Sequence, residues 1–527
     1  MRLLFIWPNK DSFGFKPINI ALLSALAKRE GWDTRLFDTT EIDFGHNQIW
    51  DAGESAKIFK PVDLSPYDVE KKPLFLEEEL LRELKEFSPD CIAISALSDE
   101  IQVAGKVTRV CKEAIPDVPV IWGGKYATTN PESTLLEYGA DYACVGEGLE
   151  AFPEFLHALQ TGEKGDIRQI ANLCFKDGMV VNKNKVRPLL KDLDTLPYVD
   201  WEIFDKRHSY KPFDGDVYVS GDHMLNWGCP YHCTYCINAF YHDLYDNRYV
   251  MRRYSNQRIV DELLYLKERY KLEFFKFHDE DFLMRSLKDF EELSNEYRDR
   301  VNLPFTIESN PKLVTQKKAR LLKNMNCASV SLAIETGNMV LRKDLLERVD
   351  SEEDIMNAFR WLREEGVRTS AFNLLGIPFE TRETYMETVD VNRRANPQYP
   401  NINFFFPFEN TKLRTIAIEE GNFSPDNRDQ SSVYDVRPAL HFKELSEDQL
   451  IQMKNVFVYY VKLPKAYEPY IRRSENMDEV GRRLRKQLSE IYDELVWRND
   501  GWFVDDGSQE QYLNQLQKIL SEEEESE

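Results

Sequence analysis

In the first 165 residues, short apolar runs alternate with longer segments whose apolar residues recur every three or four positions. The short runs predict β-strands at Leu3–Trp7, Thr34–Phe37, Cys91–Ser95, Val118–Trp122 and Tyr142–Val145. The longer segments predict the helices between them, at Asn19–Lys28, Phe75–Phe87, Ile101–Ala114, Pro131–Tyr138 and Phe152–Gln160. This α/β alternation favours a doubly wound, Rossmann-like parallel sheet, in which ligands bind outside the carboxyl ends of the strands.

The carboxyl ends of these predicted strands carry small residues, several of them glycines. Glycine at such a position lets the backbone approach a ligand closely, although a tight turn explains it equally well. We expect a ligand at these ends, with seven candidate residues: Ser95, Leu97, Gly123, Gly124, Gly146, Glu147 and Gly148.

A mostly polar connector, residues 166–215, precedes a second series of alternating elements over residues 216–425. Six strands are predicted there, at Val217–Ser220, Phe274–His278, Pro304–Glu308, Ser329–Ile334, Ser370–Leu375 and Ile402–Phe406. The helices between them are predicted at Asn256–Tyr270, Leu287–Arg298, Gln316–Asn324, Glu352–Glu365 and Glu380–Asn396. Six strands are two fewer than a complete barrel needs, so the pattern predicts a partial (β/α)6 TIM barrel with a lateral opening.

The last part of the chain, residues 426–527, is predicted to be helical. Apolar residues recur at helical spacing over Ser446–Leu463 and Asp478–Arg498. Its aromatic residues are interpreted as core residues: Tyr459, Tyr460, Tyr467, Tyr470 and Trp497. The acidic ending, Ser521–Glu527, predicts a disordered tail.

Charge and hydropathy exclude two classes of partner. The net charge of −23 argues against nucleic acid, because a phosphate backbone requires a basic surface. No segment approaches the roughly 18 consecutive apolar residues of a membrane span. The N-terminus also lacks the apolar core and cleavage site of a signal peptide. We therefore expect a cytoplasmic protein that binds neither nucleic acid nor membrane.

Three of the eight cysteines form one short motif, C-x3-C-x2-C, at Cys229, Cys233 and Cys236. A four-iron cluster is normally held by four thiolates, so three thiolates would leave one iron open to another ligand. A structural zinc site with His232 as its fourth ligand is the alternative. The remaining cysteines stand apart, mostly in apolar runs, and are interpreted as core residues: Cys91, Cys111, Cys144, Cys174 and Cys327.

The cysteine motif, with the aromatic Tyr235 before its last cysteine, resembles the cluster loop of the radical S-adenosylmethionine (SAM) superfamily. In that family the open iron of a 4Fe–4S cluster binds SAM. Electron transfer then splits SAM into methionine and a 5′-deoxyadenosyl radical. The resemblance implies a partial barrel, in agreement with the strand count, and an electron donor such as flavodoxin or ferredoxin.

Polar or glycine-containing clusters follow the predicted barrel strands, whose carboxyl ends meet at one rim. The resemblance implies that Asp279 or Glu280 holds the methionine amino group of SAM and that Glu335 meets the amino group or the ribose. The implied SAM-binding residues are Tyr235, Asp279, Glu280, Glu308, Glu335, Gly376, Ile377 and Pro378. Asn410 stands where the family usually has glycine, and asparagine tolerates the left-handed conformation that such a turn needs.

The segments Pro119–Thr128 and Asp141–Gly148 resemble the cobalamin-binding domain that precedes the radical domain in one subgroup of this superfamily. The resemblance implies that the seven candidates of the first domain contact cobalamin. The motif Asp-x-His-x-x-Gly, whose histidine ligates cobalt in other cobalamin proteins, is missing. His46 is the only histidine before residue 157. We therefore expect cobalamin to bind without a protein histidine beneath cobalt.

The resemblance implies a methyltransferase that acts on an unactivated carbon of a small-molecule or peptide substrate. The adenosyl radical would remove a hydrogen atom, and methylcobalamin would supply the methyl group. A radical SAM cyclase or rearrangement enzyme stays open, as does a zinc-stabilised binding protein with a degenerate barrel. A methylthiotransferase is disfavoured, because its second cluster needs three clustered cysteines, whereas Cys91, Cys111 and Cys144 lie inside predicted strands or helices.

Overall fold

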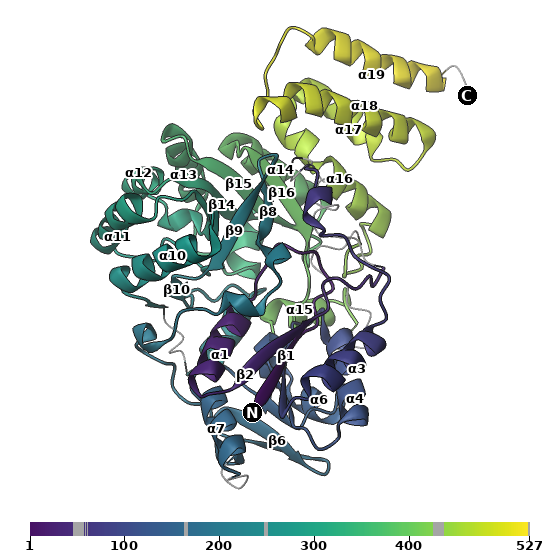
Figure 1. Ribbon diagram of the computed structural model, residues 1–527. Coiled ribbons are helices and arrows are strands. Elements are labelled where there is room, and N and C mark those ends of the chain that lie inside the picture. Colours follow the sequence, from purple (N-terminus) through teal and green to yellow (C-terminus); the bar gives the residue numbers. More distant parts are fainter. Residues whose placement is uncertain are drawn as a thin grey trace.

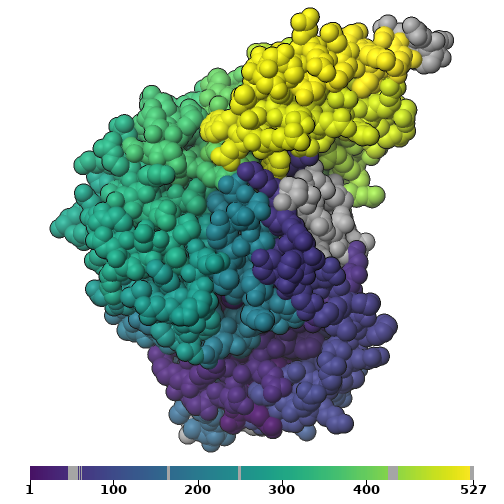
Figure 2. All heavy atoms as spheres, turned by 45° about the horizontal axis from the view of Figure 1, so that its top comes forward, coloured from purple at the N-terminus to yellow at the C-terminus, as the bar shows by residue number. Residues whose placement is uncertain are grey.

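The computed structural model describes residues 1–45, 57, 60, 62–162, 167–246, 251–424 and 437–524. Two sheets form two successive layers of the molecule, and the C-terminal helices lie at the end opposite to β1 (Figure 1). In the space-filling view, the first domain, in purple and blue, contacts the barrel, in teal and green (Figure 2).

The first sheet has the predicted doubly wound architecture. Its five parallel strands run in the order β2 (Asp33–Asp38), β1 (Arg2–Trp7), β3 (Cys91–Ser95), β4 (Val120–Gly123) and β5 (Tyr142–Cys144). The helices that follow these strands are α1 (Ile18–Arg29), α3 (Leu76–Phe87), α4 (Ile101–Ala114), α5 (Gly124–Thr129), α6 (Pro131–Leu136) and, after β5, α7 (Ala151–Thr161).

Alternate residues of β1 are buried on opposite faces of this sheet. Leu3 and Phe5 pack in one core with α1 and α7, whereas Leu4 and Ile6 pack in a second core with α3 and α4. A strand that is buried on both faces is apolar at every position, which explains the continuous apolar run in the sequence.

The connector differs from the prediction, because it contributes strands to both sheets. β6 (Leu173–Asp177) and β7 (Val180–Lys183) form an antiparallel hairpin that extends the first sheet beyond β5. β8 (Tyr210–Phe213) pairs antiparallel with the first barrel strand. The connector also buries Leu196 and Trp201 in a core that both domains share.

The second sheet is a curled half-barrel with the six predicted parallel strands. Their order is β16 (Tyr399–Phe404), β15 (Arg368–Leu375), β14 (Cys327–Glu335), β13 (Phe305–Ser309), β12 (Phe274–Phe277) and β9 (Asp216–His223). Five helices connect these strands: α10 (Asn256–Tyr270), α11 (Leu287–Arg300), α12 (Gln316–Asn324), α13 (Glu352–Glu364) and α14 (Arg382–Ala395). The edge strands β8 and β16 do not pair with each other, so the barrel is open on one side.

The C-terminal region is helical, as predicted. It comprises α15 (Lys412–Glu419), α16 (Glu447–Lys462), α17 (Glu468–Ser474), α18 (Glu479–Leu495) and α19 (Gln509–Glu524). Tyr459, Tyr460 and Tyr467 are buried in its core. The prediction of a disordered tail from Ser521 is wrong for its first four residues, which continue α19. Across the described ranges, no helix is long and apolar enough to cross a membrane.

Candidate cofactor and substrate site

A cavity of about 890 Å³ lies between the first domain and the barrel. Its wall includes all seven residues that the strand-end pattern selected in the first domain: Ser95, Leu97, Gly123, Gly124, Gly146, Glu147 and Gly148. On the barrel side, the wall includes Cys236, Tyr235 and Glu280. The structure therefore brings the candidate cobalamin residues and part of the predicted cluster and SAM site to one cavity.

The glycines of the first domain are required for different reasons. Gly124 has φ +91°, and a Cβ atom there would lie 2.9 Å from the carbonyl oxygen of Ala96. Gly146 has φ +79°, and a Cβ atom there would lie 2.3 Å from the Tyr245 hydroxyl oxygen. A Cβ atom on Gly123 would meet no atom within 4 Å, so this glycine leaves open space beside the cavity. That space suits the close backbone approach of a large, flat cofactor such as cobalamin.

Glu147 ties the last of these loops to the barrel. Its backbone N–H donates to the hydroxyl of Tyr245, the residue that follows α9 (Ile237–Leu244), at 2.9 Å. Its carboxylate pairs with Arg252 of β11 (Arg252–Arg253). Arg252 also donates to the carbonyl oxygen of Leu190 at 2.7 Å.

A second pair of contacts joins the two domains at the end of β16. The Ser98 hydroxyl donates to the Glu409 carboxylate at 2.6 Å, and the Asn410 side-chain amide donates to the carbonyl oxygen of Thr129 at 2.8 Å. Asn410 adopts φ +59°, so the turn forms with asparagine in the left-handed position, as expected. The loops at the strand ends of the two sheets are therefore fixed against each other.

The cysteine motif lies on the loop between β10 (Asn226–Trp227) and α9. Cys229 is buried, whereas Cys233 and Cys236 are half-buried. Burial raises the pKa of each of these three thiols. Cys236 is the residue that precedes the first turn of α9, and its N–H donates to the Cys233 carbonyl oxygen at 3.0 Å.

The donor set fits a four-iron cluster. Such a cluster bonds each thiolate to a different iron, so the three sulfur atoms need not converge on one point. Within the described ranges, no three His, Cys, Asp or Glu side chains converge on a position for a single metal ion. His232, the fourth ligand of the zinc alternative, stacks on His242 with the ring centroids 4.0 Å apart. The other five cysteines are buried and scattered, as predicted.

Asp279 braces the entry to the cluster loop. Its carboxylate accepts hydrogen bonds from the backbone N–H groups of Leu225, at 3.1 Å, and Asn226, at 2.6 Å. Asp279 is 3% exposed, and burial raises its pKa to about 7. The neighbouring Glu280 is exposed and reaches the cavity wall. Of the two carboxylates proposed for the SAM amino group, only Glu280 lines the cavity.

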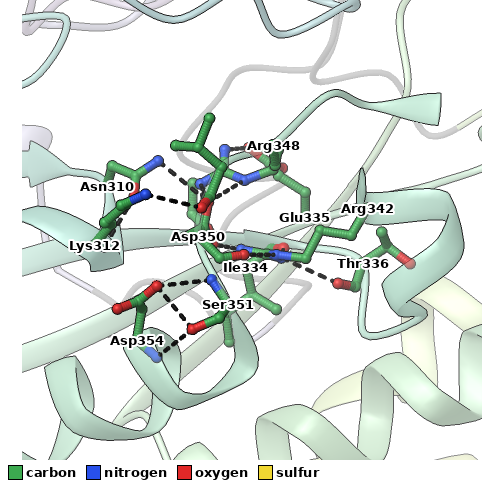
Figure 3. A network of polar contacts seen from close by, with 12 residues as sticks. Asn310, Lys312, Ile334, Glu335, Thr336, Arg342, Arg348, Asp350, Ser351 and Asp354 are labelled. Atoms are coloured by element: carbon green, nitrogen blue, oxygen red, sulfur yellow. Dashed lines mark hydrogen bonds and ion pairs between the residues drawn. The ribbon is translucent and has the colours of Figure 1, made fainter. Parts of the chain in front are cut away.

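A buried network of charged side chains includes Glu335, Arg342, Arg348 and Asp350 (Figure 3). The Tyr235 hydroxyl donates to Glu335 at 2.9 Å and accepts from Arg348 at 2.9 Å. Arg348 also donates to Asp350 at 3.0 Å, and Asp350 pairs with Arg342. Burial raises the pKa of Glu335, and Arg348 partly offsets this effect. Sequence reasoning missed both arginines, because nothing in the local pattern of residues 342–350 distinguishes them from surface residues.

The other predicted SAM residues do not line the cavity. Glu308 pairs with Lys276 at 2.7 Å. The loop at Gly376, Ile377 and Pro378 is buried, and the Gly376 N–H donates to the carboxylate of Glu380. Burial raises the pKa of Glu380 to about 8. These positions remain predictions for the SAM site.

Comparison with known proteins agrees with this geometry. The radical SAM superfamily model matches residues 227–391, and the B12-binding domain model matches residues 12–156. The chain therefore carries a radical SAM domain, preceded by a B12-binding domain. Its domains imply a 4Fe–4S cluster, SAM and cobalamin as cofactors.

Two relatives and one solved structure cover most of the chain. The chain is 23% identical over 389 residues to an uncharacterized methyltransferase, PH0819, of Pyrococcus horikoshii, covering 73% of this chain and 82% of the relative. It is 27% identical over 494 residues to the anaerobic magnesium-protoporphyrin IX monomethyl ester cyclase of Cereibacter sphaeroides, covering 89% and 72%. The fold is similar to that of OxsB, a cobalamin-dependent SAM radical enzyme whose structure was solved with aqua-cobalamin and SAM bound. The TM-score is 0.63 and the sequence identity is 13%, and the match covers 99% of this chain and 80% of OxsB.

Proposed function

We propose that this protein is a cobalamin-dependent radical SAM methyltransferase that acts on an unactivated carbon. One observation supports this most directly: the glycine-rich ends of the B12-binding domain and the cluster loop of the radical domain line the same cavity. Transfer of a methyl group to a substrate radical requires the methyl donor and the radical source to meet the same substrate atom.

In this proposal the bound cofactors supply the radical and the methyl group, and the chain positions them. Cys229, Cys233 and Cys236 would hold the cluster, while Tyr235 and Glu280 would contact SAM. Aromatic side chains form much of the cavity wall: Phe5, Trp7, Phe152, Trp227, Tyr241 and Phe406. Such a wall excludes water, which protects a reactive intermediate from side reactions.

A radical cyclisation is the second candidate, because the relative that covers 89% of this chain is named as a cyclase. The products of the two reactions differ in composition. Methylation adds one carbon from the methyl donor to the substrate, whereas cyclisation adds none. A cavity of about 890 Å³ that also receives cofactors favours a small molecule over a folded protein as the substrate.

The test uses the anaerobic enzyme, reconstituted with cluster and cobalamin, and SAM labelled with ¹³C in its methyl group. Candidate substrates are supplied with a flavodoxin or ferredoxin system as the electron donor. We expect formation of 5′-deoxyadenosine and a product that carries one ¹³C-methyl group. The Cys229→Ala, Cys233→Ala, Cys236→Ala triple variant is the control. A product that loses hydrogen and gains no ¹³C would favour the cyclase.

The proposal includes cobalamin bound without a protein histidine. His46 lies outside the described residues, and His278, which lines the cavity, has its Nε2 atom engaged 2.6 Å from Asp222. Electron paramagnetic resonance of the cobalt(II) form reports the axial ligand. We expect no nitrogen splitting from a protein imidazole, and such a splitting would contradict this part of the proposal.

A further inference from the structure

Four ionisable side chains gather where the loop before α1 meets the inside of the barrel. Lys211 and Asp222 form a buried ion pair, and His278 Nε2 lies 2.6 Å from Asp222 Oδ1. Lys16, on the loop before α1, is 5% exposed and donates to the Ser209 hydroxyl at 2.6 Å. The Lys16 ammonium also lies 4.7 Å from the ring centroid of Trp201, which helps to fix its position.

The charges in this group do not balance. Asp222 is the carboxylate that acts on both Lys16 and Lys211, so two cations share one anion. The next ion pair along the barrel, Lys276 with Glu308 at 2.7 Å, is balanced by itself. Among the residues whose placement is described, no carboxylate lies within 4.0 Å of the Lys16 ammonium.

Burial lowers the pKa of Lys16 to about 8, and Asp222 opposes this shift. A buried cation without a full partner is unfavourable, and an anion that enters the site removes the imbalance. Lys16 and His278 both line the cavity that holds the candidate cofactor sites. The excess positive charge is therefore accessible to a ligand.

We propose that Lys16 binds an anionic group of the substrate, a carboxylate or a phosphate. This inference deepens the proposed function, because the anionic group belongs to the molecule that would be methylated. Lys16 fixes one end of that molecule against the barrel. The remainder extends along the cavity between the cluster loop and the glycine-rich strand ends.

Six carboxylates line the cavity wall, and within the described residues none of them lies within 4.0 Å of the Lys16 ammonium: Asp11, Asp99, Glu100, Glu147, Glu280 and Glu409. Three of them have other roles. Glu147 pairs with Arg252, and Glu409 accepts from Ser98. Burial raises the pKa of Glu100 to about 8, so this side chain is mostly neutral at pH 7. None of these three supplies the missing negative charge at Lys16.

Cobalamin itself carries a phosphodiester, so the same ammonium group could serve the cofactor instead of the substrate. Whether a Lys16 variant retains cobalamin distinguishes a role in cofactor binding from a role in substrate binding. The variants are Lys16→Met, the conservative Lys16→Arg, and Lys125→Met. Lys125 is the matched control, because it is a lysine on the same cavity wall that lies beside Gly124 of the first domain.

The probes are inorganic phosphate and acetate, each compared with chloride at equal ionic strength. The thermal stability of the anaerobic enzyme, loaded with cluster and cobalamin, reports binding, because a ligand that binds only the folded state stabilises it. We expect at least one probe to stabilise the wild type, Lys16→Arg and Lys125→Met. In Lys16→Met the affinity should fall by about ten- to a hundredfold.

Two results would overturn the inference. One is that neither anion stabilises the wild type, or that Lys16→Met responds as the wild type does. The other is that Lys16→Met loses cobalamin on desalting while Lys16→Arg and Lys125→Met retain it, which would assign Lys16 to the cofactor. The proposed function fails separately: anion binding at Lys16 with no ¹³C-methyl transfer to any carboxylate or phosphate substrate would refute methylation alone.

Discussion

The residues at the carboxyl ends of the strands differ between the two sheets in what they contact. In the first domain, all seven predicted ligand-binding residues line the cavity, and most of them present backbone or a small side chain. In the barrel, two of the eight predicted SAM-binding residues, Tyr235 and Glu280, line it. The barrel carboxylates are instead occupied by protein groups, as Asp279 and Glu335 show.

The cause of this difference is the cost of burying a polar atom. A buried carboxylate needs hydrogen-bond donors, and the nearest donors are usually those of the protein itself. A glycine has no such requirement, so it can face an open space until a ligand arrives. In the first domain, glycine at a strand end is therefore the better indicator of an accessible site, whereas in the barrel Gly376 is buried and donates its N–H to Glu380.

The largest effect is expected at the cluster loop. Substitution of Cys229, Cys233 and Cys236 together by alanine removes the three thiolates, so cluster iron and reductive cleavage of SAM should both disappear. Cobalamin binding should persist, because the glycine-rich ends belong to a separate domain. Iron analysis, visible absorption and cobalamin retention are the measurements. Full iron content in the triple variant would refute the assignment of the cluster.

Asp279 and Glu280 test whether adjacent carboxylates have different roles. Asp279→Ala leaves two buried N–H groups without an acceptor, so the free energy of unfolding should fall by about 1–3 kcal/mol or more and the cluster loop should lose iron. Glu280→Ala removes one acceptor, that of the Gly228 N–H beside Cys229, so stability and iron should fall less than in Asp279→Ala, whereas SAM binding should weaken by about ten- to a hundredfold. Chemical unfolding, iron content and SAM titration measure these outcomes. Weaker SAM binding with normal stability in Asp279→Ala would place Asp279 in the SAM site.

Replacing Glu335 by alanine should weaken SAM binding to a similar extent. Glu335 does not line the cavity, but its carboxylate orients Tyr235. The matched control is Tyr235→Phe, which keeps the ring and removes the hydroxyl contact. Both variants should keep a normal cluster, since no cluster cysteine is changed. Unchanged SAM affinity and cleavage rates in both would show that this network only stabilises the barrel.

Substitutions at Gly123 and Gly124 test whether each glycine leaves space for a ligand or is required by the backbone around it. Gly124→Ala should lower the free energy of unfolding by about 1–2 kcal/mol, because the residue is left-handed and its Cβ would approach the Ala96 carbonyl oxygen. Gly123→Ala should leave stability unchanged and weaken cobalamin binding about tenfold, because its Cβ enters open space. Thermal unfolding and cobalamin titration distinguish the two. Normal cobalamin binding by Gly123→Ala would remove this residue from the site.

The smallest effect is expected at Phe379, which is 52% exposed and adopts φ +65°. A bulky residue in the left-handed region is strained, so Phe379→Gly should raise the free energy of unfolding by up to about 1 kcal/mol. Phe379→Ala retains the Cβ atom and should give no comparable gain. Chemical unfolding measures both, and equal stability of the two variants would show that the strain is negligible.

The sequence predicted the parallel strands well, because buried strands produce apolar runs that stand out from their surroundings. It missed β6 and β7, since both are short and each has only two or three apolar residues followed by two polar ones. The cysteine loop and the seven strand-end residues of the first domain could also be selected from sequence, because both depend on local spacing.

Long-range partners could not be predicted. Arg348 contacts Tyr235, which lies 113 residues earlier in the sequence, and Lys16 of the first domain interacts with Asp222 of the barrel. Each is an ordinary charged residue in its local context, and only the fold removes it from water. The same limit explains why Asp279 was expected to bind SAM: its donors, Leu225 and Asn226, belong to another strand end.

Helix α9 connects the cluster loop to the B12-binding domain. It begins directly after Cys236 and ends at Leu244, and the hydroxyl of the next residue, Tyr245, accepts the N–H of Glu147. At 1.5 Å per residue, its eight residues form a rigid strut about 12 Å long. The cluster loop precedes one end of this helix. The residue after its other end, Tyr245, contacts the Glu147 loop of the B12-binding domain. Helix α9 thus connects the two cofactor sites directly, in addition to the contacts of Glu147 with Arg252 and of Ser98 with Glu409.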